Sequence, residues 1–394
     1  MIPVEEALAR VLGLARPVGT ERVPLAAAAG RVLAVAAVAT RDQPPFDASA
    51  MDGYAVIGDP VAGDSFALAG EASAGHGLGG RLRPGEAVRI FTGAPVPEGA
   101  TRVVLQEDVE RLDGRIRLTA DAGRGTNIRP RGQDFRAGDR FEPRRLRPND
   151  LALLAAMNIP VVEVARRPVV ALIATGDELV MPGEVPRADQ IIASNSFALK
   201  ALVEAEGAEA RLLPIARDTE AELRLVLGLA AGADLIVTIG GASVGDHDLV
   251  ARVASAMGLE RAVYKVAMRP GKPLMAGRLA GVPMLGLPGN PVSAVVCAHL
   301  FLLPMLRAML GLPKAGAPLR RAELAVALPP NPARAHYMRA RLEPREGLPL
   351  IAPFDSQDSA LLGVLARADA LLVRPAGDLA RDAGERVDCI LLNT

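Results

Sequence analysis

A short apolar run that leads into a glycine-rich loop constrains the fold of this chain most strongly. Residues 234–250 are DLIVTIGGASVGDHDLV. The β-branched run from Asp234 to Ile239 predicts a buried strand. The loop that follows contains Gly240, Gly241, Ser243, Gly245, Asp246 and Asp248. Ligands of open α/β sheets lie beyond the carboxyl ends of the strands, where glycines let backbone N–H groups approach an anion. The two aspartates are the wrong sign for phosphate alone, so they predict a hard cation such as Mg²⁺. A solvated turn is the alternative, and the motif alone favours neither.

Strand and helix patterns alternate around this loop. PVVALIATGDEL from residue 168 is typical of a strand and a loop, NSFALKALVEAEG of a helix capped by Asn195 or Ser196, and TEAELRLVLGLAAG of another helix. Further strands are predicted at 262–267, 273–279 and 283–287, followed by a long helix from 291. This alternation predicts a mostly parallel sheet.

Three loops therefore belong at one edge of that sheet: TGDEL, GGASVGDHD and LPGNP. Asn290 suits a helix N-cap and Pro291 the first helical position. A free helix N-terminus at the carboxyl end of a strand binds anions. Three such loops are more specific than any one of them.

Composition limits the function. The 45 basic and 45 acidic residues balance, which argues against a nucleic-acid binder. The apolar helix expected over 291–310 contains His299, Pro304 and Arg307, so we interpret it as a core helix and expect no membrane span. The N-terminus favours an amphipathic helix over an export signal, and two cysteines form no metal motif; a cytoplasmic enzyme is expected.

Lysine is rare and unevenly placed. Only four of the 45 basic residues are lysines, and two of them, Lys265 and Lys272, lie in YKVAMRPGKP. A compact ammonium has uses that arginine lacks. If the strand at 265 continues extended, Lys265 and Arg269 point to one face, and Lys272 follows a turn. This segment predicts a cationic pocket for a tetrahedral dianion, although so small a count also allows chance.

The remaining chain is divided by its patterns. Short strands broken by Gly and Pro predict a β-rich insert at 45–135. Arg124, Arg129, Arg131 and Arg136 form a basic group there, and on charge alone we favour a solvated edge. A helix is predicted at 148–157. Segments 1–44 and 136–168 are interpreted as one elongated, discontinuous N-terminal domain, 169–317 as a three-layer α/β domain, and 318–394 as a β-barrel-like domain with one short helix.

Seven ordered motifs resemble the molybdopterin molybdenumtransferase family, which includes MoeA and the gephyrin E domain. They are FDASAMDGYAV, RIFTGAPVPEGA, NIRPRGQDF, TGDEL, GGASVGDHD, RPGKP and LPGNPVSA. The resemblance spans nearly the whole chain. It implies an elongated four-part protomer, a homodimer, and a reaction in which adenylylated molybdopterin and molybdate give molybdenum cofactor and AMP with a divalent cation, Mg²⁺.

The resemblance also implies roles for individual residues. Catalytic roles are implied for Asp52, Thr92, Asp134, Glu178, Asp218 and Asp248, with Glu178 and Asp248 as metal ligands. Substrate binding is implied for Arg129, Gly240, Gly241, Ser243, Gly245, Lys265, Arg269, Lys272, Pro288, Asn290, Pro291, Arg339 and Ser359. Many family members have Lys where this chain has Arg269, so the resemblance implies a different geometry at an oxyanion there.

Three functions follow as hypotheses. The leading one is a molybdenum insertase whose dimer shares its active sites between subunits, with the adenylyltransferase and acceptor molybdoenzymes as possible contacts. The second is a molybdopterin adenylyltransferase, since related single-domain enzymes share the TGDEL and GGxSxG loops but lack everything outside 169–317. The third is a dimeric, non-enzymatic scaffold.

Overall fold

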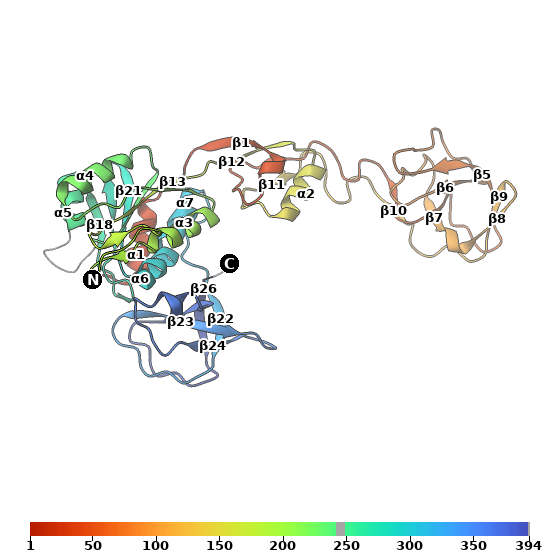
Figure 1. Cartoon of the computed structure of the whole chain (residues 1–394). Helices are drawn as coiled ribbons and strands as arrows, with labels where there is room; N and C mark the ends of the chain where they lie inside the picture. Colours follow the sequence, from red (N-terminus) through yellow and green to blue (C-terminus); the bar gives the residue numbers. More distant parts are fainter. Residues whose placement is uncertain (242–248, 393–394) are drawn as a thin grey trace. The chain divides into compact units, whose positions relative to one another are not determined.

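The computed structural model describes residues 1–241 and 249–392. The chain divides into two units, one made of residues 1–21 and 165–394 and the other of 22–164. The chain passes between them within β1 (Thr20–Pro24) and β12 (Val161–Ala165), which pair with each other. Figure 1 labels the elements of each unit.

The α/β part is built on one six-stranded sheet. Its order is β16 (Glu209–Leu212), β13 (Val169–Ala174), β17 (Leu235–Ile239), β21 (Val282–Leu287), β20 (Met275–Leu279) and β18 (Glu260–Tyr264). The first four strands are parallel, β20 is antiparallel to both of its neighbours, and β18 therefore runs in the direction of the first four. The prediction of a mostly parallel sheet is confirmed.

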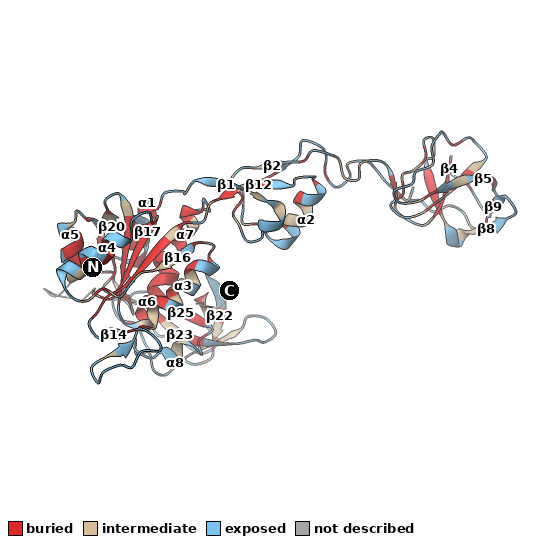
Figure 2. Cartoon of the chain, turned by 45° about the horizontal axis from the view of Figure 1, so that its top comes forward, coloured by how far each residue is buried: buried red, intermediate tan, exposed pale blue. Residues whose placement is uncertain are grey.

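Helices cover both faces of this sheet because its strands are apolar on both sides. Along β13, Val170 and Leu172 belong to one core, and Ala171 and Ile173 to the other. The first core includes α1 (Val4–Leu14), α3 (Asn195–Ala205), α6 (Pro291–Cys297) and α7 (Leu303–Met309), and the second includes α4 (Glu220–Leu229) and α5 (Leu249–Ala256). Figure 2 shows the buried strands between these helices. The three-layer arrangement is confirmed.

The apolar helix that begins at Pro291 is a core helix, as predicted. It runs as α6, a π-helical segment Ala298–Leu302, and α7. Pro304, which has no N–H to donate, is the second residue after the π-helical segment. Pro291–Met309 is long and apolar enough to cross a membrane, but nearly all of it is buried inside the protein.

Two local predictions differ from the structure. We expected the first helix in the elongated N-terminal segment, but α1 packs on the α/β sheet because Val4, Ala7 and Val11 complete its core. The cap of α3 is Ser194 rather than Asn195 or Ser196.

A closed barrel follows the α/β part. Its strands β22 (Arg320–Leu324), β23 (Ala335–Glu343), β24 (Leu350–Pro353), β25 (Ala370–Arg374) and β26 (Arg386–Leu391) form a ring through the β23–β25 pairing. The short strand β19 (Met268–Arg269), from the α/β part, adds to β23. One short helix, α8 (Leu362–Leu365), precedes β25. The predicted C-terminal barrel is confirmed.

The second unit is rich in strands. Its main sheet has the order β7 (Arg102–Leu105), β4 (Gly53–Val56), β6 (Glu86–Ile90), β5 (Ser65–Ala72), β9 (Arg115–Leu118) and β8 (Val109–Leu112). Two small sheets pair β3 (Ala48–Ser49) with β10 (Ile128–Arg129) and β2 (Ala37–Val38) with β11 (Arg140–Phe141). Helix α2 (Pro148–Ala156) lies within the predicted range. Leu33, Phe141 and Leu154 share one core, which joins the two halves of the discontinuous segment. The four domain boundaries themselves stay predictions.

A buried charge cluster holds the barrel together, and we expect its loss to be costly. Asp378 accepts hydrogen bonds from Arg374 Nε at 2.6 Å and Arg381 Nη2 at 2.8 Å, and the Arg374 side chain is only 3% exposed. Asp378→Asn leaves that guanidinium without its counter-charge, so we expect the barrel to lose about 3–5 kcal/mol of stability. Urea-dependent hydrogen exchange of barrel amides measures this.

The matched control is Asp355→Asn, an exposed aspartate of the same barrel, which should change stability by less than about 0.5 kcal/mol. Hydrogen bonds from Arg381 and Arg374 lower the pKa of Asp378. The stabilisation is therefore present at neutral pH and is lost as the pH falls through that lowered pKa. Equal stabilities of the two variants would contradict this role.

Candidate functional site

Three parallel strands end level at one edge of the α/β sheet. Ala174 pairs in register with Ile239, and Ile239 with Leu287. The loops that follow these strands surround a pocket of about 830 Å³. From the predicted set, the pocket is lined by Glu178, Asp218, Gly240, Gly241, Pro288, Asn290 and Pro291. The structure thus brings the three predicted loops together; the chemical roles of their residues stay predictions.

The glycines after β17 are required by the packing of these loops. Gly240 has φ +97°, and a Cβ there would lie 2.7 Å from the carbonyl oxygen of Thr175. Gly241 has φ +65°, and its Cβ would lie 2.3 Å from a methyl carbon of Val250. Gly289 of the third loop is itself close enough that its Cβ would touch Gly240. The glycines therefore let three loops meet, in addition to leaving backbone accessible to an anion.

The TGDEL loop is fixed by the loop after β16. Asp177 Oδ1 accepts a hydrogen bond from the N–H of Asp218 at 3.0 Å, and Arg217 Nη1 donates to the carbonyl oxygens of Asp177 and Leu179 at 3.1 and 3.0 Å. The Glu178 carboxylate folds back over Gly176, where a Cβ would come within 2.3 Å of its oxygen. Glu178 and Asp218 both line the pocket.

The third loop is fastened to the barrel rather than left free. Asn290 is the N-cap of α6, but its side chain donates to Ser359 Oγ at 3.0 Å and makes no capping bond. The N–H of Val292 donates to the carbonyl oxygen of Ser359 at 3.1 Å. The prediction of a free helix N-terminus is therefore wrong in part. The N–H of Val292 is already bonded to Ser359, and Pro291 has no N–H to offer a ligand.

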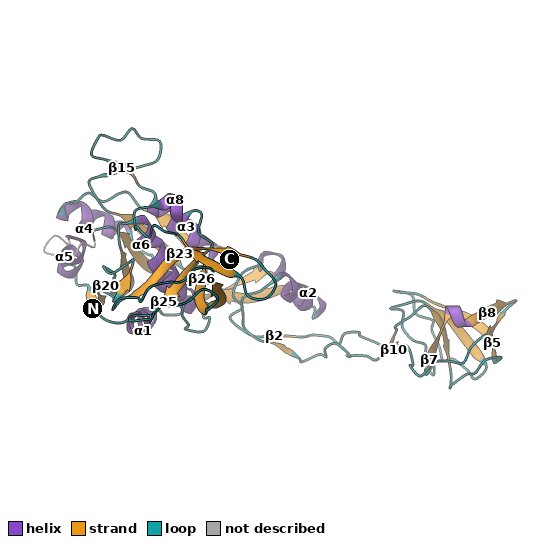
Figure 3. Ribbon diagram, turned by 90° about the horizontal axis from the view of Figure 1, so that it is seen from below, coloured by secondary structure: helices purple, strands orange, loops and turns teal. Residues whose placement is uncertain are grey.

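Several pocket residues were missed by the sequence reasoning. Leu179, Ile191 and Ile192 line the pocket from the arm that contains β14 (Leu179–Val180) and β15 (Ile191–Ile192), which projects in Figure 3. Asn195, predicted only as a cap, donates from Nδ2 to the carbonyl oxygen of Gly289 at 2.7 Å. Arg252 lines the pocket from α5. Leu179 lies in the TGDEL motif, but no local pattern marked Ile191, Ile192 or Arg252 as pocket residues, since their place depends on contacts distant in sequence.

The predicted cationic segment takes a different course. Lys265 has φ +65°, so the strand predicted at 262–267 ends early, at Tyr264, and the condition that would place Lys265 and Arg269 on one face of a continuous extended strand is not met. The Lys265 ammonium lies 4.7 Å from the centre of the Tyr264 ring. Of the described residues that line the pocket, Pro273 alone comes from this segment; Lys265, Arg269 and Lys272 are not among them.

Arg339 is placed to hold a loop. It is 1% exposed, and its guanidinium donates to the carbonyl oxygens of Ser356 at 3.1 Å and Leu361 at 3.3 Å. These bonds span the turn that carries Ser359. Direct contact of Arg339 with a substrate stays a prediction, and the structure shows its part in placing Ser359.

The predicted residues of the β-rich insert form a second group. Asp52 Oδ1 accepts hydrogen bonds from the N–H and Oγ1 of Thr92 at 2.7 and 2.8 Å. These two bonds, the N–H bond first, lower the pKa of Asp52. Arg129 and Asp134 line a pocket of about 570 Å³ together with Phe46.

The basic group of the insert is solvated, as favoured on charge alone. Arg124, Arg129, Arg131 and Arg136 are all exposed. Arg131 is bonded to two acidic neighbours. Its side-chain Nε donates to Asp42 at 2.5 Å, and its backbone N–H donates to Asp47 at 2.8 Å. Arg129, in the 570 Å³ pocket, makes no ion pair in the described part of the chain.

Comparison with known proteins identifies the family. Residues 2–158 match the MoeA N-terminal region (domain I and II), 171–308 a probable molybdopterin binding domain, and 321–392 the MoeA C-terminal region (domain IV). The chain is 36% identical to a molybdopterin molybdenumtransferase of Nostoc sp., over 93% of this chain and 88% of that protein. The chain belongs to the MoeA family.

Two further comparisons agree with this membership. The chain is 36% identical to molybdopterin molybdenumtransferase 2 of Mycobacterium tuberculosis, over 97% of each chain. The crystal structure of the molybdopterin biosynthesis MoeA protein from Pyrococcus horikoshii OT3 matches 99% of this chain and 100% of its own, with a TM-score of 0.85 and 28% identity. MoeA membership therefore rests on the sequence and on the fold.

Of the two metal ligands expected in this MoeA protein, the structure describes Glu178 but not Asp248. Ser243, Gly245 and Asp248 lie outside the described residues. In the described ranges, 1–241 and 249–392, no three His, Cys, Asp or Glu side chains converge as a metal site. Mg²⁺ usually keeps several waters and needs only one or two carboxylates beside substrate phosphates. The carboxylates of Glu178 and Asp218 on the pocket wall fit that requirement.

The glycine contacts give a stability prediction with an internal control. Gly240→Ala forces a Cβ against Thr175 at positive φ, so we expect a loss of about 1–3 kcal/mol. Gly228→Ala, in α4 with open space around its Cα, should instead stabilise by about 0.4–1 kcal/mol. Urea unfolding of the two purified variants and the wild type measures these changes in the free energy of unfolding. A Gly240→Ala protein as stable as the wild type would show that the loops do not need this close approach.

Proposed function

We propose that this protein is a molybdopterin molybdenumtransferase of molybdenum cofactor biosynthesis, which inserts molybdate into adenylylated molybdopterin and releases AMP. The observation that carries the proposal is the 830 Å³ pocket formed by three loops within the probable molybdopterin binding domain. The names of the two relatives with 36% identity support the same activity. The role of each pocket residue is part of the proposal.

The pocket suits a substrate with an anhydride-linked phosphate. The loop that begins at Gly240 and Gly241 lies at the carboxyl ends of parallel strands, where backbone N–H groups bind anions, although the N–H of Gly240 itself donates to the carbonyl oxygen of Leu287. Ser243 and Gly245 continue this loop and share the proposed role. Arg252 adds a cationic side chain to the lining of the pocket. Pro288 and Pro291 restrict the conformation of the third loop, while Ser359 holds Asn290 in place.

We assign Mg²⁺ to Glu178 and Asp248, with Asp218 beside Glu178. When bound, the cation neutralises charge that develops on the scissile phosphate. Glu178 and Asp218 contribute carboxylate oxygens and orient the attacking oxygen. Because Asp177 and Arg217 fix the backbone of both loops, these carboxylates need little reorganisation on binding.

We assign the molybdate to the basic side chains of Lys265, Arg269 and Lys272. A dianion needs local positive charge in a chain with no net charge. Arg339 supports this site by holding the turn of Ser359. The insert residues Asp52, Thr92, Arg129 and Asp134 complete the proposed site.

Two other functions remain distinguishable. A molybdopterin adenylyltransferase would form adenylylated molybdopterin from ATP without molybdate. The matched regions at 2–158 and 321–392 lie outside the molybdopterin binding domain and favour the insertase. A non-enzymatic scaffold would show neither activity. Incubation of the pure protein with each substrate pair separates the three functions.

Glu178→Gln should fold normally but release AMP about 10²–10³ times more slowly, because one preorganised carboxylate is lost from the pocket wall. AMP release from adenylylated molybdopterin, with and without molybdate, is the measurement. Glu204→Gln, an exposed residue on α3, should retain the wild-type rate. A Glu178→Gln enzyme as fast as this control would remove Glu178 from the mechanism.

We also propose a cytoplasmic homodimer whose active sites are shared between subunits. The proposed site residues come from both units of the chain, and a two-fold dimer can combine one unit of each subunit at two equivalent sites. The adenylyltransferase that supplies the substrate and the acceptor molybdoenzymes are its expected contacts.

Complementation tests the shared site. Asp52→Asn and Glu178→Gln proteins, each expected to be strongly impaired alone, are mixed under conditions that exchange subunits. If sites are shared, each heterodimer has one site with both lesions and one with none, so about a quarter of wild-type activity should return at equal mixing. Native mass spectrometry confirms the exchange. Exchange without recovered activity would place the site within one chain.

A further inference from the structure

His336 has a buried polar atom with no partner. It lies on β23, is 9% exposed, and its Nε2 makes no hydrogen bond. Only two other buried side-chain atoms in the described residues share this condition, Arg102 Nε and Thr238 Oγ1. A buried polar group without a partner costs about 1–3 kcal/mol, so such an atom calls for an explanation.

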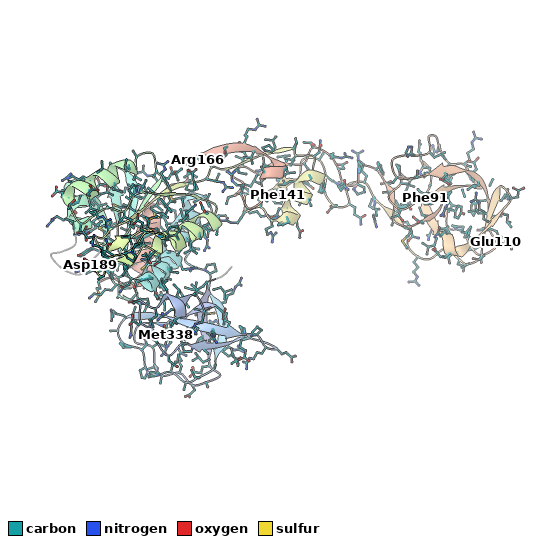
Figure 4. All side chains as sticks on the ribbon, in the orientation of Figure 1. Phe91, Glu110, Phe141, Arg166, Asp189 and Met338 are labelled. Carbon is teal, nitrogen blue, oxygen red and sulfur yellow. The ribbon has the colours of Figure 1, made fainter. Side chains whose placement is uncertain are left out.

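His336 lies in a row of basic residues across three strands. It pairs in register with Arg269 of β19 on one side and with Arg374 of β25 on the other. Residues in direct register have adjacent side chains on the same face of a sheet. Met338, labelled in Figure 4, and Ala340 follow on the same face and belong to the barrel core. The row therefore lies at the end of the barrel's inner face.

The two arginines of the row differ in their partners. Arg374 is neutralised by Asp378 and also donates to the carbonyl oxygens of Pro329 and Leu379. Arg269 is exposed and has no acidic partner in the described part of the chain. The residue opposite Arg269 is an imidazole rather than a carboxylate, so its charge is available to a ligand.

The surroundings of His336 are uniformly positive. Burial, followed by the charges of Arg269, Arg374, Arg339 and Arg334, lowers its pKa to about 4. A neutral imidazole carries one N–H donor and one acceptor nitrogen. It does not repel Arg269 and can hydrogen-bond an oxygen atom held by that guanidinium.

We propose that His336 is a further residue of the oxyanion site assigned above to Arg269, its register partner. The guanidinium supplies charge and a fork of donors, and His336 Nε2 supplies a hydrogen bond to the same anion. Arg269 precedes Pro273, which lines the 830 Å³ pocket, by four residues. The anion is molybdate or a phosphate group. The inference rests on the proposed function for the choice of these two anions, and it adds His336 to the site.

The test observes His336 directly in the full-length protein. The chain has four histidines, and selective ¹⁵N labelling gives imidazole spectra in which the signal lost in His336→Ala is assigned. Sodium molybdate and inorganic phosphate are titrated separately at pH 7. We expect the His336 nitrogen signals of the wild type to shift and saturate with molybdate, with phosphate, or with both. The responding anion identifies the source.

Variants separate binding from packing. Arg269→Ala should abolish the response of His336, and His336→Ala should weaken anion binding on the order of ten- to a hundred-fold by calorimetry. His336→Glu places a carboxylate opposite Arg269 and should abolish binding. Arg341→Ala removes an exposed arginine of the same strand and should leave binding unchanged. The wild-type titration needs no variant to fold.

Two results would overturn the inference: His336 signals that respond to neither anion, or a full response in Arg269→Ala. Failure of the proposed function is distinguishable. If AMP release is absent while His336 responds, the oxyanion site stands and the assigned reaction fails. If AMP is released at the expected rate while His336 stays silent, the reaction stands and this site fails.

Discussion

The common register of β13, β17 and β21 is the constraint on which the site depends. Ala174, Ile239 and Leu287 end level, so three loops start from one line. These strands are buried on both faces, and a shift of one residue would exchange the residues of the two cores. The core packing that stabilises the sheet therefore also fixes where the loops begin, and the pocket inherits its position from the hydrophobic core.

Beyond the strand ends, the backbone itself does most of the positioning. Gly240 approaches Thr175, Gly289 approaches Gly240, and Asp177 and Asp218 bind each other's loops through N–H groups. Short side chains and glycines leave few rotamers to freeze, so the pocket walls can be placed with little loss of conformational entropy. The barrel takes part through Ser359, which binds the third loop at both Asn290 and Val292.

The sequence predicted what depends on local pattern. Apolar runs and turn residues were sufficient for the parallel sheet, the core helix at Pro291, the barrel and the meeting of three loops. It did not predict the left-handed backbone at Lys265, because a single positive φ leaves no periodic trace in a Val-rich segment. The sequence also assigned α1 to the N-terminal domain rather than to the α/β sheet on which it packs. Ile191 and Arg252 were missed as pocket residues, because local sequence does not specify which distant segments a helix or an arm contacts.

The environments of individual charged residues were also not predictable from the sequence. Four arginines of this chain are indistinguishable by composition, yet their neighbours in the structure give them different functions. Arg374 is buried and neutralised by Asp378, Arg131 is bound to Asp42, and Arg339 is held by carbonyl oxygens. Arg269 alone of these faces a neutral imidazole. In a protein without net charge, the capacity to bind an anion depends on which cations lack a carboxylate partner, and strand register decides that for Arg269.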